Sequence, residues 1–454
     1  MQGPGMTPEL IARYDQRVPR YTSYPTAPHF KPDITPGTYT SWLAELVPDK
    51  PLSLYLHVPF CAELCLYCGC NTTVTRSYKA VAAYVDCLER EIELVSERLP
   101  SRMAVSHIHW GGGTPTILSP EDLQRISRHL GAAFEILPDA EIAVEIDPRT
   151  ITPEHVDALA ASGLNRASLG VQDFDPKVQE TIRRVQSFER TAQVAGWLRQ
   201  AGVSGLNLDL MYGLPFQTSE SAVRSVKMAL DLDPDRIALF GYAHVPWMKR
   251  HQALLPEDSL PDAVARVEQR EAAAAAIVEG GYVQIGIDHF ARPDDPMARR
   301  QGEGRLHRNF QGYTTDEASA LIGFGTSAIG SLPQGYIQNA PTTVAYREAV
   351  LSGRLPVVRG VALSKDDRLR RTIIERLMCD FSVNLDEIAS EFRGSVSELA
   401  SEIKAIDELA ADGLVARDGF TLTIPDEGRA LVRNVCAVFD RYLETGAQRH
   451  SRAL

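Results

Sequence analysis

The run SLYLHVPFCAELCLYCGCNT (residues 53–72) joins an apolar segment to a loop that contains Cys61, Cys65, Cys68 and Cys70. Its first eight residues have the composition of a buried strand. Five similar short runs follow at 107–113, 142–147, 166–171, 206–213 and 236–242. Helical periodicity occupies 78–99, 120–134, 153–161, 178–201, 219–230 and 260–279. Six strand-then-helix units predict an α/β fold in which right-handed crossovers curl a parallel sheet into an open (β/α)6 partial barrel.

Three of the four clustered cysteines have the spacing C-x3-C-x2-C, which suits three irons of a cubic iron–sulfur cluster. Electron-transfer clusters are closed by four cysteines, so a three-cysteine loop with Tyr67 before its last ligand indicates a free iron that binds something else, namely S-adenosylmethionine. Cys70 is too close to Cys68 to join the same cube easily and is expected near the site. The alternative is a zinc site, which uses four ligands and usually a second, distant pair.

The remaining cysteines, Cys87, Cys379 and Cys436, are scattered in helical segments and form no second pair. An odd number of mostly clustered cysteines fits a reducing compartment. No apolar stretch approaches the ~20 residues of a membrane span, and the N-terminus lacks the apolar core of a secretory signal. We therefore expect a cytoplasmic protein. A net charge of −12 argues against a nucleic-acid binder.

Polar and glycine-rich residues follow the ends of the predicted strands, where parallel β/α folds gather their chemistry. They are Gly111-Gly112-Gly113-Thr114-Pro115, Glu145, Asp147, Gln172, Asp209, residues 212–215 and residues 242–246. Exposed glycine backbone can approach the amine of a methionyl group closely, while Glu145, Gln172 and Asp209 supply partners for ribose and adenine. Each feature alone also fits a turn or a structural carboxylate. Their coincidence at one rim favours a binding site.

The last ninety residues no longer follow the strand-then-helix pattern of the preceding chain. Helical patterns at 366–379, 385–392 and 397–411 precede two short strands around Asp418-Gly419 and a closing helix at 427–442. This order predicts a mainly helical, winged-helix-like C-terminal domain. The alternative, a DNA-binding module, conflicts with the acidic third helix, so we expect a cap beside the barrel mouth. The expected division is an N-terminal segment over the barrel mouth (1–36), a catalytic domain (37–345) and the C-terminal domain (346–454).

Several ordered strings resemble the radical S-adenosylmethionine enzymes and, among them, the oxygen-independent coproporphyrinogen III oxidases (dehydrogenases) of haem biosynthesis. Beside the cysteine run with its GCN ending, they are PRYTSYPTAPHF (19–30), HWGGGTPT (109–116), EIDPR (145–149), YGLPFQT (212–218), FGYAHVPW (240–247), QIGIDHFA (284–291), LHRNFQGYTT (306–315), GFGTSAIG (323–330) and ERLMCDFSVNL (375–385). The resemblance covers most of the chain.

The resemblance implies roles for matching positions. Cys61, Cys65 and Cys68 hold a 4Fe-4S cluster. A first S-adenosylmethionine is lined by Tyr55, Tyr67, Gly111, Gly112, Glu145 and Ile329, and a second by Gly113, Thr114, Gln172, Arg184, Asp209 and Ala243. At position 183 the family commonly has asparagine, whereas this chain has arginine. The match to the second S-adenosylmethionine site is therefore incomplete. Cys70, Tyr21 and Arg20 are the further candidate active-site residues.

The implied reaction begins with one-electron cleavage of S-adenosylmethionine to a 5′-deoxyadenosyl radical, which abstracts hydrogen from a propionate of coproporphyrinogen III. Loss of carbon dioxide and one electron leaves a vinyl group, and two rounds yield protoporphyrinogen IX. A tetracarboxylate substrate calls for cations, for which Arg20, Arg184, His289, His307 and Arg308 are candidates. The expected electron donor is of flavodoxin or ferredoxin type, and the expected enzyme is a monomer. A haem-binding chaperone and a radical enzyme acting on another tetrapyrrole remain the alternative functions.

Overall fold

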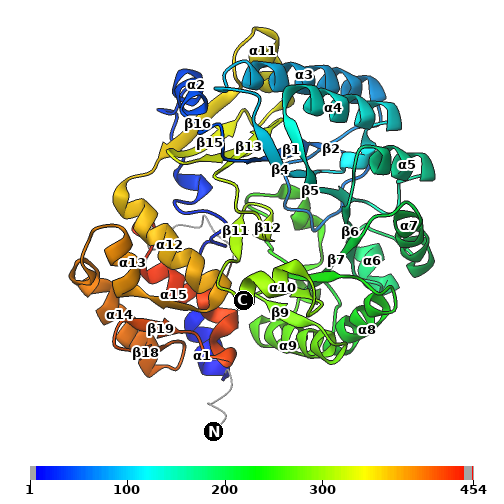
Figure 1. The fold of residues 1–454 in the computed structure, drawn as a ribbon. Helices are drawn as coiled ribbons and strands as arrows, with labels where there is room; N and C mark the ends of the chain where they lie inside the picture. The colour runs from blue at the N-terminus through cyan, green and yellow to red at the C-terminus, as the bar shows by residue number, and fades with distance from the viewer. Residues whose placement is uncertain (1–6, 444–451, 453–454) are drawn as a thin grey trace.

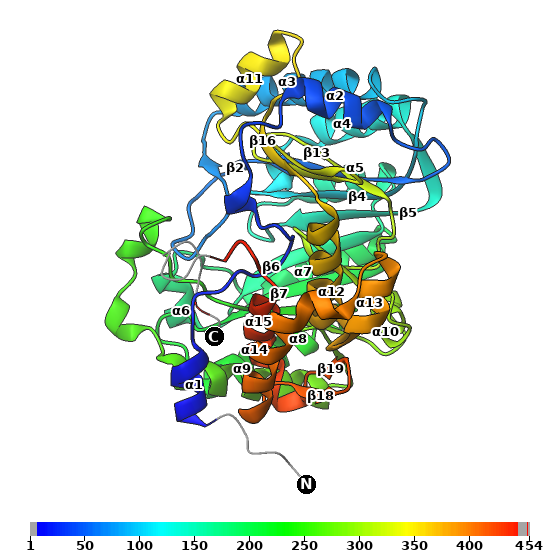
Figure 2. The same ribbon diagram turned by 90° about the vertical axis from the view of Figure 1, so that its left-hand side faces the viewer.

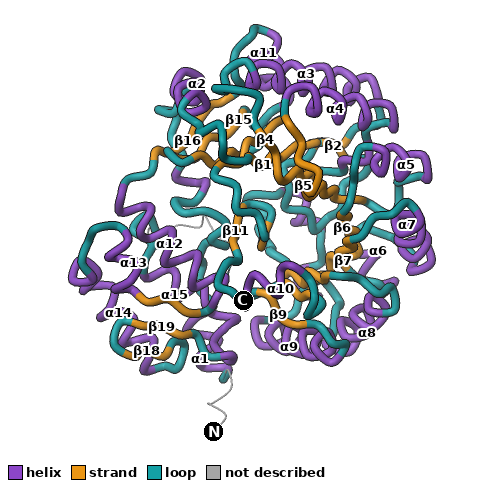
Figure 3. Tube along the Cα trace, in the orientation of Figure 1, coloured by secondary structure: helices purple, strands orange, loops and turns teal. Residues whose placement is uncertain are grey.

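Six parallel strands form the centre of the fold and lie side by side in chain order. The structure is a computed structural model that describes residues 7–443 and residue 452. The six strands are β1 (Leu52–Val58), β4 (Ala104–Gly112), β5 (Glu135–Ile146), β6 (Arg166–Gln172), β7 (Gly205–Tyr212) and β8 (Arg236–Gly241). The curved sheet that they form in Figures 1 and 3 confirms the predicted open barrel.

Helices cover the outer face of these strands, as Figure 1 shows. They are α3 (Tyr78–Ser96), α4 (Pro120–Ala133), α5 (Pro153–Ala161), α6 (Pro176–Thr181), α7 (Phe188–Gln200), α8 (Ser219–Leu230) and α9 (Ala263–Glu279). Side-chain caps fix where several begin: Ser119 accepts from Asp122 N and Asp262 from Ala265 N. The apolar faces of these helices and the strands share one large core.

The helix predicted over 178–201 is two helices, because the chain turns between α6 and α7. Arg183 adopts a left-handed conformation with φ 54°, and Ser187 caps the second helix by accepting from Arg190 N. The break turns Arg184 inward, where only 6% of its surface remains exposed. Periodicity alone did not reveal this turn, since a non-glycine residue in the left-handed region depends on tertiary contacts.

Additional strands extend the sheet at both edges, and the sequence did not predict them. Strand β13 (Ala320–Phe324) lies parallel to β1, followed by antiparallel β14 (Ile329–Leu332), β15 (Gly335–Asn339) and β16 (Val357–Ala362). The other edge adds β10 (His289–Ala291) and β9 (Val283–Ile285). The sheet thus continues past residue 345, where the sequence predicted the end of the catalytic domain.

Smaller elements surround this sheet. Helix α2 (Pro36–Ala44) lies near its β16 edge and α11 (Thr343–Leu351) lies beside α3, while α10 (Pro296–Gly302) precedes a hairpin of β11 (His307–Asn309) and β12 (Gly312–Thr314). No helix among the described residues is long and apolar enough to cross a membrane.

The C-terminal region has its own core and the predicted order of helices and hairpin. Its elements are α12 (Lys365–Asp380), β17 (Ser382–Asn384), α13 (Leu385–Glu391), α14 (Ala400–Ala411), β18 (Ala416–Asp418), β19 (Thr421–Thr423) and α15 (Val432–Val438). Strand β17 was not predicted; it pairs with β19 to complete a three-stranded sheet.

The N-terminal segment packs into the C-terminal core. Helix α1 (Pro8–Tyr14) and the chain after it contribute Ile11, Tyr14, Tyr21 and Tyr24 to that core. Figure 2 shows α1 beside the C-terminal region, far from α2 at the other end of the molecule. The segment between them therefore spans the space between the barrel and the C-terminal region.

Candidate active site at the carboxyl ends of the strands

The cysteine loop directly follows β1 and is closed at its base by short strands. Strand β2 (Phe60–Cys61) pairs with β3 (Thr73–Val74). Thr75 N donates to Cys61 O at 3.0 Å just beyond them. Within the loop, Cys68 N donates to Cys65 O at 3.2 Å. The loop therefore emerges from the carboxyl end of the first barrel strand, where parallel β/α folds place their sites.

A second segment, around the short helix η3 (Arg250–Leu254), supports the loop from outside. His251 Nε2 donates to Cys68 O at 2.8 Å, Lys249 Nζ to Cys70 O at 2.7 Å, and Gln252 Nε2 to Tyr67 O at 3.0 Å. These three carbonyls would otherwise lack partners in the described structure. Sequence reasoning missed the three side chains, because they lie about 180 residues after the loop and match no recognisable motif.

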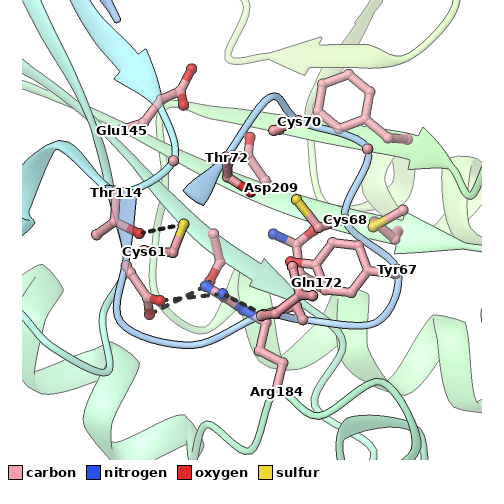
Figure 4. Close-up of a pocket in the computed structure, with 18 of the residues that line it drawn as sticks. Cys61, Tyr67, Cys68, Cys70, Thr72, Thr114, Glu145, Gln172, Arg184 and Asp209 are labelled. Carbon is pink, nitrogen blue, oxygen red and sulfur yellow. Dashed lines mark hydrogen bonds and ion pairs between the residues drawn. The ribbon is translucent and has the colours of Figure 1, made fainter. Parts of the chain in front are cut away.

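The cysteines line one cavity of about 1240 Å³ together with most of the predicted site residues. Figure 4 shows Cys61, Cys68 and Cys70 around it, with Glu145, Gln172, Arg184 and Asp209 entering from other strands and loops. The predicted residues that line it are Arg20, Cys61, Cys65, Tyr67, Cys68, Cys70, Gly112, Gly113, Thr114, Glu145, Gln172, Arg184, Asp209 and Ala243. Residues from six strand ends thus meet in one place.

Four of the predicted cofactor-binding and catalytic residues do not line the cavity, and neither do the candidate cations His289, His307 and Arg308. Tyr55 and Gly111 lie behind Glu145: a Cβ on Gly111 would stand 2.7 Å from the Glu145 carboxylate and 3.1 Å from the Tyr55 ring. Ile329 begins β14 and packs near Phe30 and Tyr336. Tyr21 is buried in the C-terminal core, where its hydroxyl donates to Asp440 at 3.1 Å.

The glycine triplet allows β4 to approach the cysteine loop and β1 closely. A Cβ on Gly112, whose φ is 115°, would stand 2.7 Å from the His57 ring. A Cβ on Gly113 would stand 2.6 Å from Phe60 O and 3.0 Å from Cys61 Sγ. Only glycine provides this space, so the triplet is required by packing around the first cysteine.

The environments of the thiols differ. Burial raises the pKa of Cys61 to about 11, although Thr114 Oγ1 donates to its sulfur at 3.6 Å. A hydrogen bond from the Cys70 thiol lowers the pKa of Cys68 to about 6 and raises the pKa of Cys70 well above its usual value. Each of these two thiols thus shifts the pKa of the other.

Cations and a buried carboxylate surround Cys65. Arg149 Nη2 and Arg184 Nη1 lie 3.6 Å and 3.7 Å from its sulfur. Both arginines also bind Asp147, at 2.7 Å and 3.4 Å, and Arg184 Nη2 donates to Gly170 O at 2.6 Å. The two arginines keep the pKa of Asp147 low despite its burial. Two guanidinium groups and a carboxylate thus fix the surroundings of the Cys65 sulfur.

Two carboxylates stand opposite the thiols at the ends of β5 and β7. Glu145 accepts from Gly112 N at 3.2 Å and contacts His109 Nε2 at 3.2 Å. Asp209 accepts from Ser168 at 3.0 Å and Asn207 at 2.7 Å, and burial together with the Glu145 charge raises its pKa to about 6. These carboxylates can accept from hydroxyl or amino groups of a ligand.

The donor set fits an iron–sulfur cluster. Among the described residues, no three His, Cys, Asp or Glu side chains converge as a single metal ion would require. Cys61, Cys65 and Cys68 instead face a shared cavity that exceeds the space of one ion many times over. Thiolates are the ligands such clusters use, and these three are the residues that would hold it.

Comparison with known proteins agrees with this geometry. Residues 55–229 match the model of the radical SAM superfamily, and residues 363–431 match that of the HemN C-terminal domain. A curated relative from Bradyrhizobium diazoefficiens, named oxygen-independent coproporphyrinogen III oxidase, is 52% identical over 450 residues, 99% of this chain and 100% of its own. The chain belongs to the oxygen-independent coproporphyrinogen III oxidase family. Another member, from Paracoccus denitrificans, is 44% identical over 98% of both chains.

A solved structure of the same family supports the architecture. Coproporphyrinogen III oxidase (HemN) from Escherichia coli, described as a radical SAM enzyme, superposes with a TM-score of 0.89 at 40% identity. The match covers 94% of this chain and all of that chain. Members of the radical SAM superfamily use a 4Fe-4S cluster and S-adenosylmethionine, which are the cofactors that the three-thiol cavity predicts.

Proposed function

We propose that this protein oxidatively decarboxylates two propionates of coproporphyrinogen III to vinyl groups without oxygen, giving protoporphyrinogen IX for haem biosynthesis. The observation that supports this most strongly is the single cavity in which Cys61, Cys65 and Cys68 face Glu145 and Asp209. The names of the relatives at 52% and 44% identity supply the substrate. The cofactors, when bound, supply the radical that removes hydrogen from the propionate.

The side chains act mainly by holding and enclosing the cofactors. Cys61, Cys65 and Cys68 would ligate the cluster. Tyr67, Gly112 and Glu145 line the cavity where a first S-adenosylmethionine would lie, with Tyr55 and Gly111 next to Glu145 and Ile329 outside the lining. Gly113, Thr114, Gln172, Arg184, Asp209 and Ala243 would contact a second. Two molecules suit a reaction carried out on two propionates.

The surroundings would keep water from the reacting atoms. Val18, Pro19 and Arg20 of the N-terminal segment also line the cavity. A closed, low-dielectric site protects a radical from side reactions. We propose further that the protein is cytoplasmic and monomeric, with a flavodoxin- or ferredoxin-type protein as electron donor.

Anaerobic reconstitution tests the proposal. Protein loaded with iron and sulfide is reduced and mixed with S-adenosylmethionine and coproporphyrinogen III, and 5′-deoxyadenosine and protoporphyrinogen are measured together. The proposal expects about two S-adenosylmethionine molecules consumed per product. Deoxyadenosine without protoporphyrinogen would point to another tetrapyrrole substrate. If cluster-loaded protein formed neither product, the result would favour a haem-binding chaperone.

A further inference from the structure

A second cavity, of about 430 Å³, adjoins the first and has an unusual charge. The two share Arg20, Phe240 and the backbone around Tyr242 as a wall. Seven arginines and three aspartates line the second cavity, in a chain whose net charge is −12. Its volume is at the lower end of the range for small-molecule sites. This is a local positive region within an acidic protein.

Some of these arginines serve to join the chain ends. Arg452 Nη1 binds Asp15 at 2.7 Å, and Arg433 Nη2 donates to Arg452 O at 3.0 Å. The Arg17 guanidinium lies over the Trp247 ring at 4.3 Å from its centroid. These contacts give Arg17, Arg433 and Arg452 a structural role.

Arg20, Arg266 and Arg308 are different, because their positive charge is not matched within the cavity. Arg308 has a side chain only 6% exposed, and its nearest carboxylate, Asp288, stands 4.0 Å away. Its Nε and Nη1, and Nε of Arg266, have no hydrogen-bond acceptor among the described residues. Arg266 Nη2 and Arg20 Nη2 donate only to backbone carbonyls, of Tyr242 and Gly241. Buried donors without acceptors are costly.

Mutual repulsion accompanies this excess of donors. The surrounding protein atoms lower the pKa of Arg20, whose residue as a whole remains exposed, and the neighbouring Arg308 and Arg266 lower it further, although Asp288 and Tyr212 oppose them. Asp288 is itself bound to His289 at 2.7 Å, so it cannot serve all three arginines. A planar guanidinium binds carboxylate in a bidentate manner. The region is therefore suited to an anionic ligand with several carboxylate oxygens.

We infer that this cavity binds the carboxylates of the tetrapyrrole that survive the reaction, and so positions the reacting propionates in the neighbouring cavity. The inference rests on the proposed function. A carboxylate that leaves as neutral carbon dioxide loses its charge, and arginines bound to it would stabilise the starting state instead of the transition state. The cationic cavity therefore suits the two propionates that remain in protoporphyrinogen IX. The cysteine-lined cavity is left for the two that react.

Binding of coproporphyrin III, the oxidised and unreactive form of the substrate, tests this in cluster-loaded protein with S-adenosylmethionine. Quenching of porphyrin fluorescence would report its Kd. Arg266→Gln and Arg308→Gln are expected to raise the Kd about tenfold or more, as loss of one partner of a desolvated charge pair does. Arg308→Lys should recover part of the affinity. Arg354→Gln, at an exposed position after α11, is the matched control and should bind like the parent protein.

Mesoporphyrin IX identifies which carboxylates are held. It keeps only the two propionates that persist in the product and has ethyl groups in place of the vinyls. Its affinity should fall by the same factor as that of coproporphyrin in both glutamine variants. A fall for coproporphyrin alone would assign the cavity to the reacting propionates and overturn the inference.

Controls separate this inference from folding and from the proposed function. Iron content, the melting temperature and S-adenosylmethionine binding should match the parent protein in each variant used. Unchanged coproporphyrin affinity in Arg266→Gln and Arg308→Gln, in a protein that forms protoporphyrinogen, would refute the inference alone. Arginine-dependent binding in a parent protein that forms no protoporphyrinogen would refute the proposed function and retain a site for tetrapyrrole carboxylates.

Discussion

Cys70 lies beside the predicted cluster ligands but is not expected to be a ligand itself. It follows Cys68 by two residues and lies outside the ligand spacing that Cys61, Cys65 and Cys68 carry. Cys61→Ala, Cys65→Ala or Cys68→Ala should therefore abolish most bound iron and visible absorbance, whereas Cys70→Ala should retain most iron. Iron and sulfide per chain after anaerobic reconstitution measure this. Equal losses in all four variants would make Cys70 a ligand.

The close packing around Gly113 predicts the effect of adding a methyl group at this position. Alanine there would place a Cβ 2.6 Å from Phe60 O and 3.0 Å from Cys61 Sγ. Overpacking of this kind costs about 1–3 kcal/mol, and displacement of Cys61 should lower iron retention. Urea denaturation and iron content measure the two effects.

Gly131 is the matched control for Gly113. It lies inside α4, and an added Cβ would meet nothing within 4 Å. Gly131→Ala should stabilise the protein by roughly 0.5–1 kcal/mol and leave iron content unchanged. If Gly113→Ala behaved like Gly131→Ala, the close packing of β4 against the cysteine loop would not matter.

At the scale of elements, Glu91 ties α3 to the strands that the sequence did not predict. Its carboxylate accepts from Gly325 N at 2.7 Å after β13, from Asn339 Nδ2 at 2.7 Å at the end of β15, and from the Tyr346 hydroxyl at 2.6 Å on α11. Burial nevertheless raises the pKa of Glu91 to about 7. One side chain thus connects three distant elements.

The raised pKa of Glu91 predicts a pH dependence of stability. Between about pH 4.5 and pH 7 the folded state keeps a proton that the unfolded state releases, so the free energy of unfolding falls as pH rises through this window. The full change is on the order of 3 kcal/mol. Urea denaturation of the parent and of Glu91→Gln at pH 5 and pH 8 should show the parent losing stability relative to the variant at the higher pH.

Glu93→Gln provides the comparison for Glu91→Gln. Glu93 lies on the same helix, and 43% of its side chain is exposed. Its replacement should leave the pH dependence of the parent unchanged. A difference between parent and Glu91→Gln that stayed constant from pH 5 to pH 8 would contradict a titrating Glu91.

The elements that sequence could predict are those set by local pattern. Helices α5 and α8 have the predicted bounds, because Pro153 and the Thr218 cap mark where they begin. Strand β13 pairs with β1 from 268 residues away, and no local signal announces that pairing. The turn at Arg183 was not predicted for a related reason. It is accompanied by tertiary contacts, which Arg184 makes with Asp147 and Gly170.

The same distinction applies to the site. Cysteine spacing and strand-end position predicted Cys61, Glu145 and Asp209 as neighbours, and one cavity contains all three. The second cavity was beyond sequence reasoning, because Arg20, Arg266 and Arg308 come from three distant segments whose meeting depends on the whole fold. The sequence analysis predicted Arg20 as a candidate active-site residue, and Arg20 and Arg308 as candidate cations for the substrate carboxylates, without placing them together.

At the scale of the whole molecule, the N-terminal segment and the C-terminal region form one unit that closes the barrel. Ile11, Tyr14, Val18, Tyr21 and Tyr24 are buried in the C-terminal core, whereas none of residues 7–33 belongs to the large barrel core. Burial of each such side chain contributes about 1.5–3 kcal/mol. Five of them together are comparable with the whole 5–15 kcal/mol stability of a domain.

Deletion of residues 1–31 should therefore loosen the C-terminal region and leave the barrel folded. We expect limited proteolysis to cut within 363–443 many times faster than in the full chain, while iron bound at the barrel's cysteines is largely retained. Tyr24→Phe is the control: it loses only the bond that the Tyr24 hydroxyl accepts from Arg441 N at 3.1 Å, so it should resist proteolysis like the full chain. A deleted protein with an intact C-terminal region would show that this region folds without the segment, and one that lost its iron would show that the barrel depends on it.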